Sequence, residues 1–396
     1  MPERNLDFDR IINRKNTNCL KYDFAEKRGM PADVLPLWVA DMDFPCAPAI
    51  QEALEKRVKE QIYGYTTGMD EEYRGIVCDY YRRHFDWTFD PQDIYFTGGV
   101  VQAISILCGL LCAQGEGIVI QTPVYHPFRR QIEANHRRCV VNPLIRHADG
   151  SYTMDLADLE EKFQDPSVKG ILLCSPHNPV GRVWKPEELC ALAELAVRYD
   201  KWIISDEIHA DIVKAGFTHH VLDALCPQLA DHIITCTAPT KTFNLAGVEC
   251  SHVIIHDPKW KALWEEKVVR QMCISEPNCF AISALKAAFS ECDEWRAQMN
   301  RKVDENEAWV TQFLREQLPE AVISPREGTY LMWVDLSAYE PDPHVLDQRI
   351  REHARVHFND GAMFGEEGAG FQRINIACPQ VIVQEAMERV AQELRK

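Results

Sequence analysis

Residues 237–244 read Thr237-Ala238-Pro239-Thr240-Lys241-Thr242-Phe243-Asn244, directly after the run His232-Ile233-Ile234-Thr235-Cys236. The earlier run is apolar and β-branched, which is typical of a buried strand. Lys241 is therefore expected just beyond the C-terminal end of a strand. A loop lysine is most often a solvated surface charge, but these flanks offer hydroxyl groups and turn chemistry instead of a charge run. We therefore regard Lys241 as a candidate reactive amine.

Apolar runs and helical segments alternate on both sides of this stretch. Strands are expected at 94–97, 117–121, 170–174, 201–205, 233–236 and 252–255, with helices at 48–61, 73–84, 100–112 and from residue 186 onward. Almost continuously apolar strands that alternate with helices are typical of a parallel α/β sheet.

The pattern changes after about residue 290. A long amphipathic helix is expected at 294–318, followed by strand-like segments near 329–336, 356–358 and 372–377 and by helices at 344–354 and 381–394. We therefore expect a large domain over residues 45–290 and a smaller α+β domain over 291–396. Residues 1–44 are expected to pack with the small domain.

The composition limits which class of protein this chain can belong to and which kinds of partner it can bind. The chain has 396 residues, 46% of them hydrophobic and 26% charged, which is ordinary for a globular protein with two sizeable cores. Its net charge of −17 argues against a nucleic acid or an anionic membrane surface as partner. The 15 cysteines form no C-x-x-C pair, which favours reduced thiols over a disulfide framework. With no secretory signal, bilayer-spanning run or metal-ligand cluster, we expect a cytoplasmic protein without a metal.

Polar residues follow the ends of several expected strands, where ligands of open parallel sheets bind. Asp206 ends the run Trp202-Ile203-Ile204-Ser205 and is expected to be buried. A buried carboxylate needs a compensating partner. This could be an arginine, the N–H groups of a helix N-terminus that it caps, or the protonated ring nitrogen of a cofactor. His209 is either a core histidine or a second contact to the same ring.

Four further candidates are weaker when each is taken alone. Gly98-Gly99 opens an expected helix, whose free N–H groups could hold a phosphate. Tyr125 could stack on a flat ring, and Asn178, set between two prolines, could donate to a ring oxygen. Arg373 has the geometry for a bidentate bond to a carboxylate. Because each has a common structural role as well, the hypothesis depends on their joint presence.

Eight motifs in the same order carry a resemblance to a known family. They are LPLWVADMDF at 35–44, YGYT at 63–66, TGGVVQAIS at 97–105, QTPVYHPF at 121–128, LCSPHNPVGRVW at 173–184, SDEIHAD at 205–211, APTKTFNLAG at 238–247 and FQRINIACP at 371–379. With them, nearly the whole chain resembles the fold-type I pyridoxal phosphate (PLP) enzymes of the aspartate aminotransferase superfamily. Within these it is most similar to the MalY/PatB-type, cystathionine β-lyase-like C–S lyases. The resemblance implies a large domain with a mostly parallel seven-stranded sheet beside a smaller α+β domain.

The resemblance also implies a role for each candidate. Lys241 would hold PLP as a Schiff base and carry the proton, Asp206 would pair with the pyridinium nitrogen, and Tyr125 would stack on the ring. Asn178 and His209 would contact the ring oxygen. The remaining implied contacts are Gly99, Val100 and Thr240 with the phosphate, Val101 with the cofactor, Tyr65 or Tyr63 of a second subunit with the same phosphate, and Arg373 and Ala40 with the substrate carboxylate.

Three positions depart from the pattern of many aminotransferases. Thr240 stands where many relatives have serine, and it keeps the hydroxyl group. Glu249 stands where many aminotransferases carry an arginine, which disfavours plain transamination and leaves one phosphate counter-charge unassigned. His209 replaces a tyrosine, as in the lyase-like branch.

The expected reaction is β-elimination from L-cystathionine or a related L-cysteine S-conjugate, giving pyruvate, ammonia and a thiol. An aminotransferase on the same scaffold is the first alternative, because it would use the same residues up to removal of the α-proton. A regulatory or interaction protein that retains the PLP fold is the second. The resemblance implies a homodimer whose active sites are shared across the interface.

Overall fold

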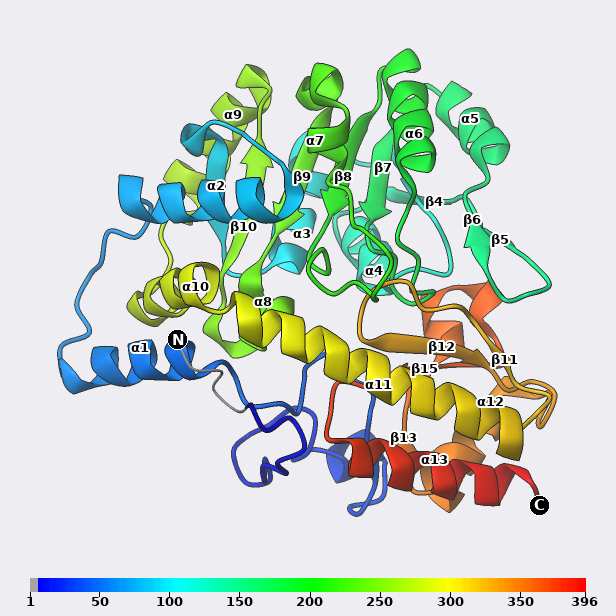
Figure 1. Cartoon of the computed structure of the whole chain (residues 1–396). Coiled ribbons are helices and arrows are strands. Elements are labelled where there is room, and N and C mark those ends of the chain that lie inside the picture. Colours follow the sequence, from blue (N-terminus) through cyan, green and yellow to red (C-terminus); the bar gives the residue numbers. More distant parts are fainter. Residues whose placement is uncertain (1–5) are drawn as a thin grey trace.

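The computed structural model describes residues 6–396, in which a large central sheet lies beside a smaller sheet (Figure 1). Within these residues the large sheet has seven strands in the order β2-β10-β9-β8-β7-β3-β4, and β10 runs antiparallel to the other six. The strands are β2 Ile94–Thr97, β3 Gly117–Ile120, β4 Arg138–Val141, β7 Val168–Cys174, β8 Trp202–Asp206, β9 Ile233–Thr237 and β10 Ser251–Ile255. The expected α/β class with a mostly parallel seven-stranded sheet is confirmed.

Helices cover both faces of this sheet. Successive residues of a strand point to opposite faces, so neighbouring residues pack against different helices. In β8, Ile203 belongs to the same buried cluster as Leu189 of α6 (Pro186–Arg198). Its neighbour Ile204 belongs instead to the cluster of Leu107 in α3 (Val100–Leu111). The other longer helices of this region are α1 Pro48–Lys59, α2 Glu71–Phe85, α4 Pro127–Ala134, α5 Leu156–Gln164, α9 Pro258–Trp264 and α10 Cys279–Glu291.

The C-terminal part is organised along α11 (Asp293–Gln317), which crosses the molecule between the large sheet and α13 (Gln380–Leu394) (Figure 1). Its sheet has the order β11-β12-β15-β14. These strands are β11 Val322–Ile323, β12 Leu331–Asp335, β14 Asn359–Asp360 and β15 Phe371–Asn375, with α12 at Pro343–Gln348. The N-terminal segment joins this part, because β1 (Leu35–Pro36) pairs in parallel with β13 (Val356–His357).

Several elements differ from the expectations. The edge strand β4 was not expected, because its four residues include the exposed Arg138 and its apolar run has only three residues. The hairpin of β5 (Ile145–Arg146) and β6 (Tyr152–Thr153) was not expected either. Residues 239–242, where turn chemistry but no helix was expected, form the single-turn helix α8 (Pro239–Thr242), in which proline occupies the first turn, a position it favours. Among residues 6–396 there is no helix both long and apolar enough to cross a membrane.

Candidate active site

A cavity of about 190 Å³ lies beyond the C-terminal ends of the parallel strands β7, β8 and β9. It is lined by Ala40, Gly98, Gly99, Val100, Val101, Tyr125, Cys174, Asn178, Asp206, Ile208, His209, Thr240, Lys241 and Ala246. The structure thus brings together candidates that lie up to 201 positions apart in the sequence, as between Ala40 and Lys241. Arg373 is not in the lining but contacts it, whereas Tyr63 and Tyr65 lie elsewhere.

Lys241 reaches the cavity from α8, the turn that follows β9. Its Nζ donates a hydrogen bond to the carbonyl oxygen of Ala40, which also accepts one from the Tyr330 hydroxyl at 2.9 Å. Burial lowers the pKa of Lys241 to about 8, although the carboxylates of Asp41 and Asp206 act in the opposite direction. An amine with this pKa is in part neutral near pH 7 and can act as a nucleophile or a base.

Asp206 ends β8 and is 4% exposed. Its Oδ1 accepts a hydrogen bond from the Ile208 backbone N–H at 3.2 Å, and no ion pair to it is found among residues 6–396. Burial raises the pKa of Asp206 to about 7, while the Ile208 bond and the Lys241 charge lower it. A buried carboxylate in this position is suited to a protonated ring nitrogen, which would supply the missing cation.

Arg373, in β15, is a buried cation that contacts the lining residue Asn178. Its Nη1 donates to Asn178 Oδ1 at 3.0 Å, and its Nη2 donates to the Trp38 carbonyl at 3.0 Å and to Asn359 Oδ1 at 2.5 Å. Its Nε is buried without a hydrogen-bond partner. Burial lowers the pKa of Arg373 to about 10. These three hydrogen-bond partners are all neutral, so the guanidinium can still bind an anion.

His209 and Tyr125 face the same cavity. Burial lowers the pKa of His209 well below its usual value, with the charges of Lys241 and Arg373 acting in the same direction. The imidazole is therefore neutral, and its Nδ1 is buried without a partner. The ring also meets Tyr330 edge to face, with 5.8 Å between the centroids. A neutral imidazole and a phenol ring could contact a flat aromatic group without adding charge.

The N-terminus of α3 forms one end of the cavity. Gly99 is the N-cap residue and has extended backbone, so the first N–H groups of the helix remain free to hold an anion. Thr240 supplies a hydroxyl at the same cavity. Exposed Glu249 lies nearby, with its Cβ 3.8 Å from the position that a side chain on Gly98 would take. The donor set therefore suits a phosphate but includes no arginine.

Neither of the two tyrosines lines this cavity in the single chain. Tyr65 is fully exposed and Tyr63 is 53% exposed, in the connection between α1 and α2 at the left edge of Figure 1. The Tyr63 hydroxyl donates to the Val58 carbonyl at 3.0 Å, and its ring lies 5.4 Å from that of Phe280. Contact with a phosphate would therefore require a second subunit, and it stays a prediction.

Some residues that line the cavity were not predicted from the sequence. Cys174 ends the expected strand at 170–174, and Ile208 stands between two expected site residues, so their positions were a usable signal. Tyr330, which is outside the lining but donates to the Ala40 carbonyl, carried no such signal, because this contact joins residues 290 positions apart.

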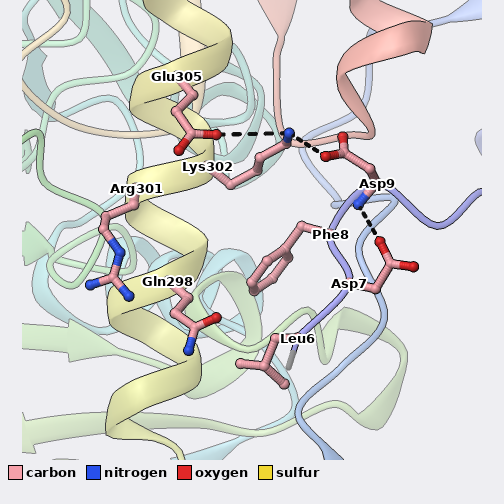
Figure 2. Close-up of a pocket in the computed structure, with 8 residues that line it drawn as sticks. All are labelled: Leu6, Asp7, Phe8, Asp9, Gln298, Arg301, Lys302 and Glu305. Carbon is pink, nitrogen blue, oxygen red and sulfur yellow. Dashed lines mark hydrogen bonds and ion pairs between the residues drawn. The ribbon is translucent and has the colours of Figure 1, made fainter. Parts of the chain in front are cut away.

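Another hollow, of about 410 Å³, lies between α11 and residues 6–9 (Figure 2). Lys302 in its wall is already paired with Asp9 at 2.7 Å and Glu305 at 3.8 Å. No expected site residue lines it. Among residues 6–396 there is also no group of three or more His, Cys, Asp or Glu arranged to hold a metal ion.

Comparison with known proteins agrees with this geometry. The cystathionine beta-lyase PatB of Bacillus subtilis (strain 168) is 36% identical, covering 97% of this chain and 99% of its own. The crystal structure of cystalysin from Treponema denticola, which contains pyridoxal 5′-phosphate, matches with a TM-score of 0.94 and 35% identity over 98% of this chain and 99% of its own. A PLP-bound C–S lyase from Staphylococcus hominis matches with a TM-score of 0.93 and 31% identity over 100% of this chain and 99% of its own.

These likenesses extend over nearly the full length of each chain, so they include both sheets and every segment that contributes to the cavity. The profile of the family described as aminotransferase class I and II matches residues 32–390. That range runs from the segment before Ala40 to α13. The chain therefore belongs to the aminotransferase class I and II family.

Proposed function

We propose that the protein is a PLP-dependent carbon–sulfur β-lyase that converts L-cystathionine or a related L-cysteine S-conjugate to pyruvate, ammonia and a thiol. The observation that carries this proposal is the single cavity in which Lys241, Asp206 and Asn178 meet. The relatives named as cystathionine β-lyase and C–S lyase support the reaction class.

The cavity fits PLP on its own chemistry. The free N–H groups at Gly99–Val100 and the Thr240 hydroxyl match a phosphate, and the unpaired Asp206 carboxylate matches a pyridine nitrogen. Asn178 and neutral His209 remain for the ring oxygen, and Val101 and Tyr125 for the flat surfaces of the ring. When bound, PLP supplies an electron sink that makes the α-proton of an amino acid acidic.

The chain's own residues would bind the substrate and move the proton. Arg373, with an unpartnered buried Nε, would hold the α-carboxylate near Ala40. Lys241 would take the α-proton at its Nζ, for which a pKa near neutrality is suitable. Breaking the Cβ–S bond then releases the thiolate, and hydrolysis of the remaining three-carbon unit gives pyruvate and ammonia. Asp206 would keep the ring nitrogen protonated throughout.

We also propose an assembly, a domain organisation and a cellular location for the enzyme. The active unit is a homodimer, in which the exposed loop at 63–66 carries Tyr63 and Tyr65 to the partner's phosphate. Residues 45–290 form the PLP-binding domain. The predicted N-terminal segment, 1–44, whose residues 1–5 lie outside the described part of the chain, packs against the small domain over 291–396. The enzyme acts in the cytoplasm on a small amino acid.

One experiment tests cofactor site and reaction together. Borohydride treatment of the loaded protein should fix PLP to the peptide that contains Lys241, as mass spectrometry would show. The same protein should release pyruvate and homocysteine from L-cystathionine without any 2-oxo acid. If 2-oxoglutarate were required and glutamate accumulated without pyruvate, the protein would be an aminotransferase instead.

A further inference from the structure

Asp211 is a buried carboxylate behind the cavity. Its side chain is 8% exposed, and it lies on the segment after β8 that also carries Asp206 and His209. It does not line the cavity, but its Oδ2 accepts a hydrogen bond from the Thr242 hydroxyl at 2.9 Å. Thr242 is the neighbour of Lys241 in α8. One hydrogen bond thus links the segment of the expected ring contacts to the turn of the reactive lysine.

Helix α8 needs such an outside contact. It has only four residues, Pro239–Thr242, and a single turn fixes many backbone angles for few internal hydrogen bonds. The Phe243 N–H closes the turn onto the Pro239 carbonyl at 2.9 Å. Because the Lys241 side chain is long and flexible, its position depends on how firmly this turn is held.

Asp211 is itself held by two long helices. Its Oδ1 accepts hydrogen bonds from the Tyr80 hydroxyl of α2 and from Arg296 Nη1 of α11, each at 2.7 Å. Asn300 of α11 donates to its backbone carbonyl at 2.8 Å. The Tyr80 ring stacks on Phe289 of α10, with 3.9 Å between the centroids. The carboxylate therefore has little freedom to move.

The charge of Asp211 is balanced by Arg296, which does not line the cavity. Burial works to lower the pKa of Arg296, but the Asp211 carboxylate outweighs it and keeps the pKa above its usual value. Arg296 Nη2 further meets His84 Nδ1 at 2.9 Å. Since the charge is compensated by Arg296, removing the Thr242 hydroxyl would leave the carboxylate paired.

We propose that Asp211 is a positioning residue which, through the Thr242 hydroxyl, fixes the Lys241 amine relative to Asp206 and His209. The inference rests on the proposed role of Lys241. It assigns a function to the acidic residue at the end of the motif SDEIHAD, which contacts neither cofactor nor substrate in the proposed mechanism. A purely structural role would instead stabilise α2, α10 and α11 without affecting the amine.

The test compares Thr242→Val, which keeps the shape of the side chain but loses the hydroxyl, with Thr242→Ser, which keeps the hydroxyl. Thr242→Val should lower kcat for L-cystathionine about tenfold or more, with KM within about twofold, because misplacing a reacting group acts on the chemical step. Thr242→Ser should stay within about twofold of the wild type. Thr242→Ala is a second variant that removes the hydroxyl without adding an apolar branch beside the carboxylate.

A second measurement reports on the Lys241 amine directly and does not depend on turnover. In full-length protein freed of cofactor, acetylation of Lys241 by acetic anhydride would be followed against pH by mass spectrometry, with exposed Lys59 as the internal standard. Burial holds the pKa of Lys241 at about 8, so a loosened turn should move its midpoint upward, toward 10.5. The shift is expected in Thr242→Val and Thr242→Ala and not in Thr242→Ser.

Two results would overturn the inference. One is a lower melting temperature in Thr242→Val with kcat and the Lys241 midpoint unchanged, which would make the contact purely structural. The other is an equal effect of the serine and valine variants, which would mean that the hydroxyl is not responsible. Failure of the proposed function shows separately, because borohydride mapping of wild-type protein would then place the cofactor away from Lys241.

Discussion

Burial shifts the pKa values of Lys241 and Asp206 in opposite directions. It lowers the pKa of Lys241 to about 8 and raises the pKa of Asp206 to about 7, and each charge partly offsets the shift of the other. Without a cationic partner, Asp206 is half neutral near pH 7. A bound ring nitrogen that keeps its proton would therefore also keep this carboxylate ionised.

Asp206→Asn tests that partnership. The amide has nearly the same shape but no charge, so the protein should fold and bind PLP. Its kcat should fall by at least ~10²-fold, as for other lost electrostatic stabilisers. Steady-state kinetics with L-cystathionine, alongside cofactor absorbance and circular dichroism, would measure this. Activity within a few-fold of the wild type would contradict the role.

Arg373→Ala tests the carboxylate anchor. Removing the guanidinium should weaken substrate binding by roughly 2–5 kcal/mol, the range for one partner of a buried charge pair. It should appear mainly in KM, while cofactor absorbance persists. Arg373→Lys is the matched control, because it keeps the charge but loses the fork that reaches Asn178 and Asn359. If the absorbance disappeared in both variants, Arg373 would have a structural or phosphate-binding role instead.

Lys241 and Asp206 could be located from the sequence, because Asp206 ends a buried strand and Lys241 lies in the turn after one, at the edge of the sheet where ligands bind. Asp211 and Tyr330 could not be located in this way. Their partners, Thr242 and Ala40, come from other parts of the chain, and no local pattern records such contacts.

Among the elements, the histidine that follows β10 joins the residue before β2 to α7 (Leu222–Leu225). His256 Nδ1 lies 2.6 Å from Asp93 Oδ2, and its Nε2 lies 2.5 Å from Asp223 Oδ2. Burial works to lower the pKa of His256, but the two carboxylates, Asp223 first, raise it above its usual value. The imidazole of His256 thus holds its proton more strongly in the folded state than in the unfolded chain.

Stability from this contact should be fully present below the unfolded pKa of histidine and lost as pH rises through the higher folded pKa. His256→Gln should therefore lower the free energy of unfolding by about 1–2 kcal/mol at about pH 6 and by less at about pH 9. Thermal unfolding of both proteins at the two pH values gives the comparison. An equal loss at both would exclude a contribution from the charge.

Element prediction succeeded where burial gives a strong pattern. The strands β7, β8 and β9 are buried on both faces and were recognised from their apolar runs. Strand β4 was missed because an edge strand has fewer neighbours, and its exposed Arg138 resembles a loop residue. Helix α8 was missed because four residues are too short to show a helical period.

For the whole molecule, the exposed tyrosine loop predicts sites shared between subunits. Mixing inactive Lys241→Ala with a weakened Tyr65→Phe protein should restore part of the activity, because one site of each hybrid dimer would combine wild-type Lys241 with wild-type Tyr65. Activity measured after subunit exchange, against each variant alone, tests this. A fully active monomer in sedimentation experiments would contradict it.

The pairing of β1 with β13 has a consequence for how the protein is made. Asn375 Nδ2 donates to the carbonyls of Val39 and Asp41, each at 2.7 Å, so the segment around Ala40 is fixed by residues near the other end of the chain. A nascent chain on the ribosome can form the large sheet early, but residues 35–41 must wait for residues 356–375 to emerge. Contacts of such long range fold slowly. Cofactor capture should therefore be a post-translational step, and a stalled chain whose last 26 residues, 371–396, are still in the ribosome should acquire no PLP absorbance.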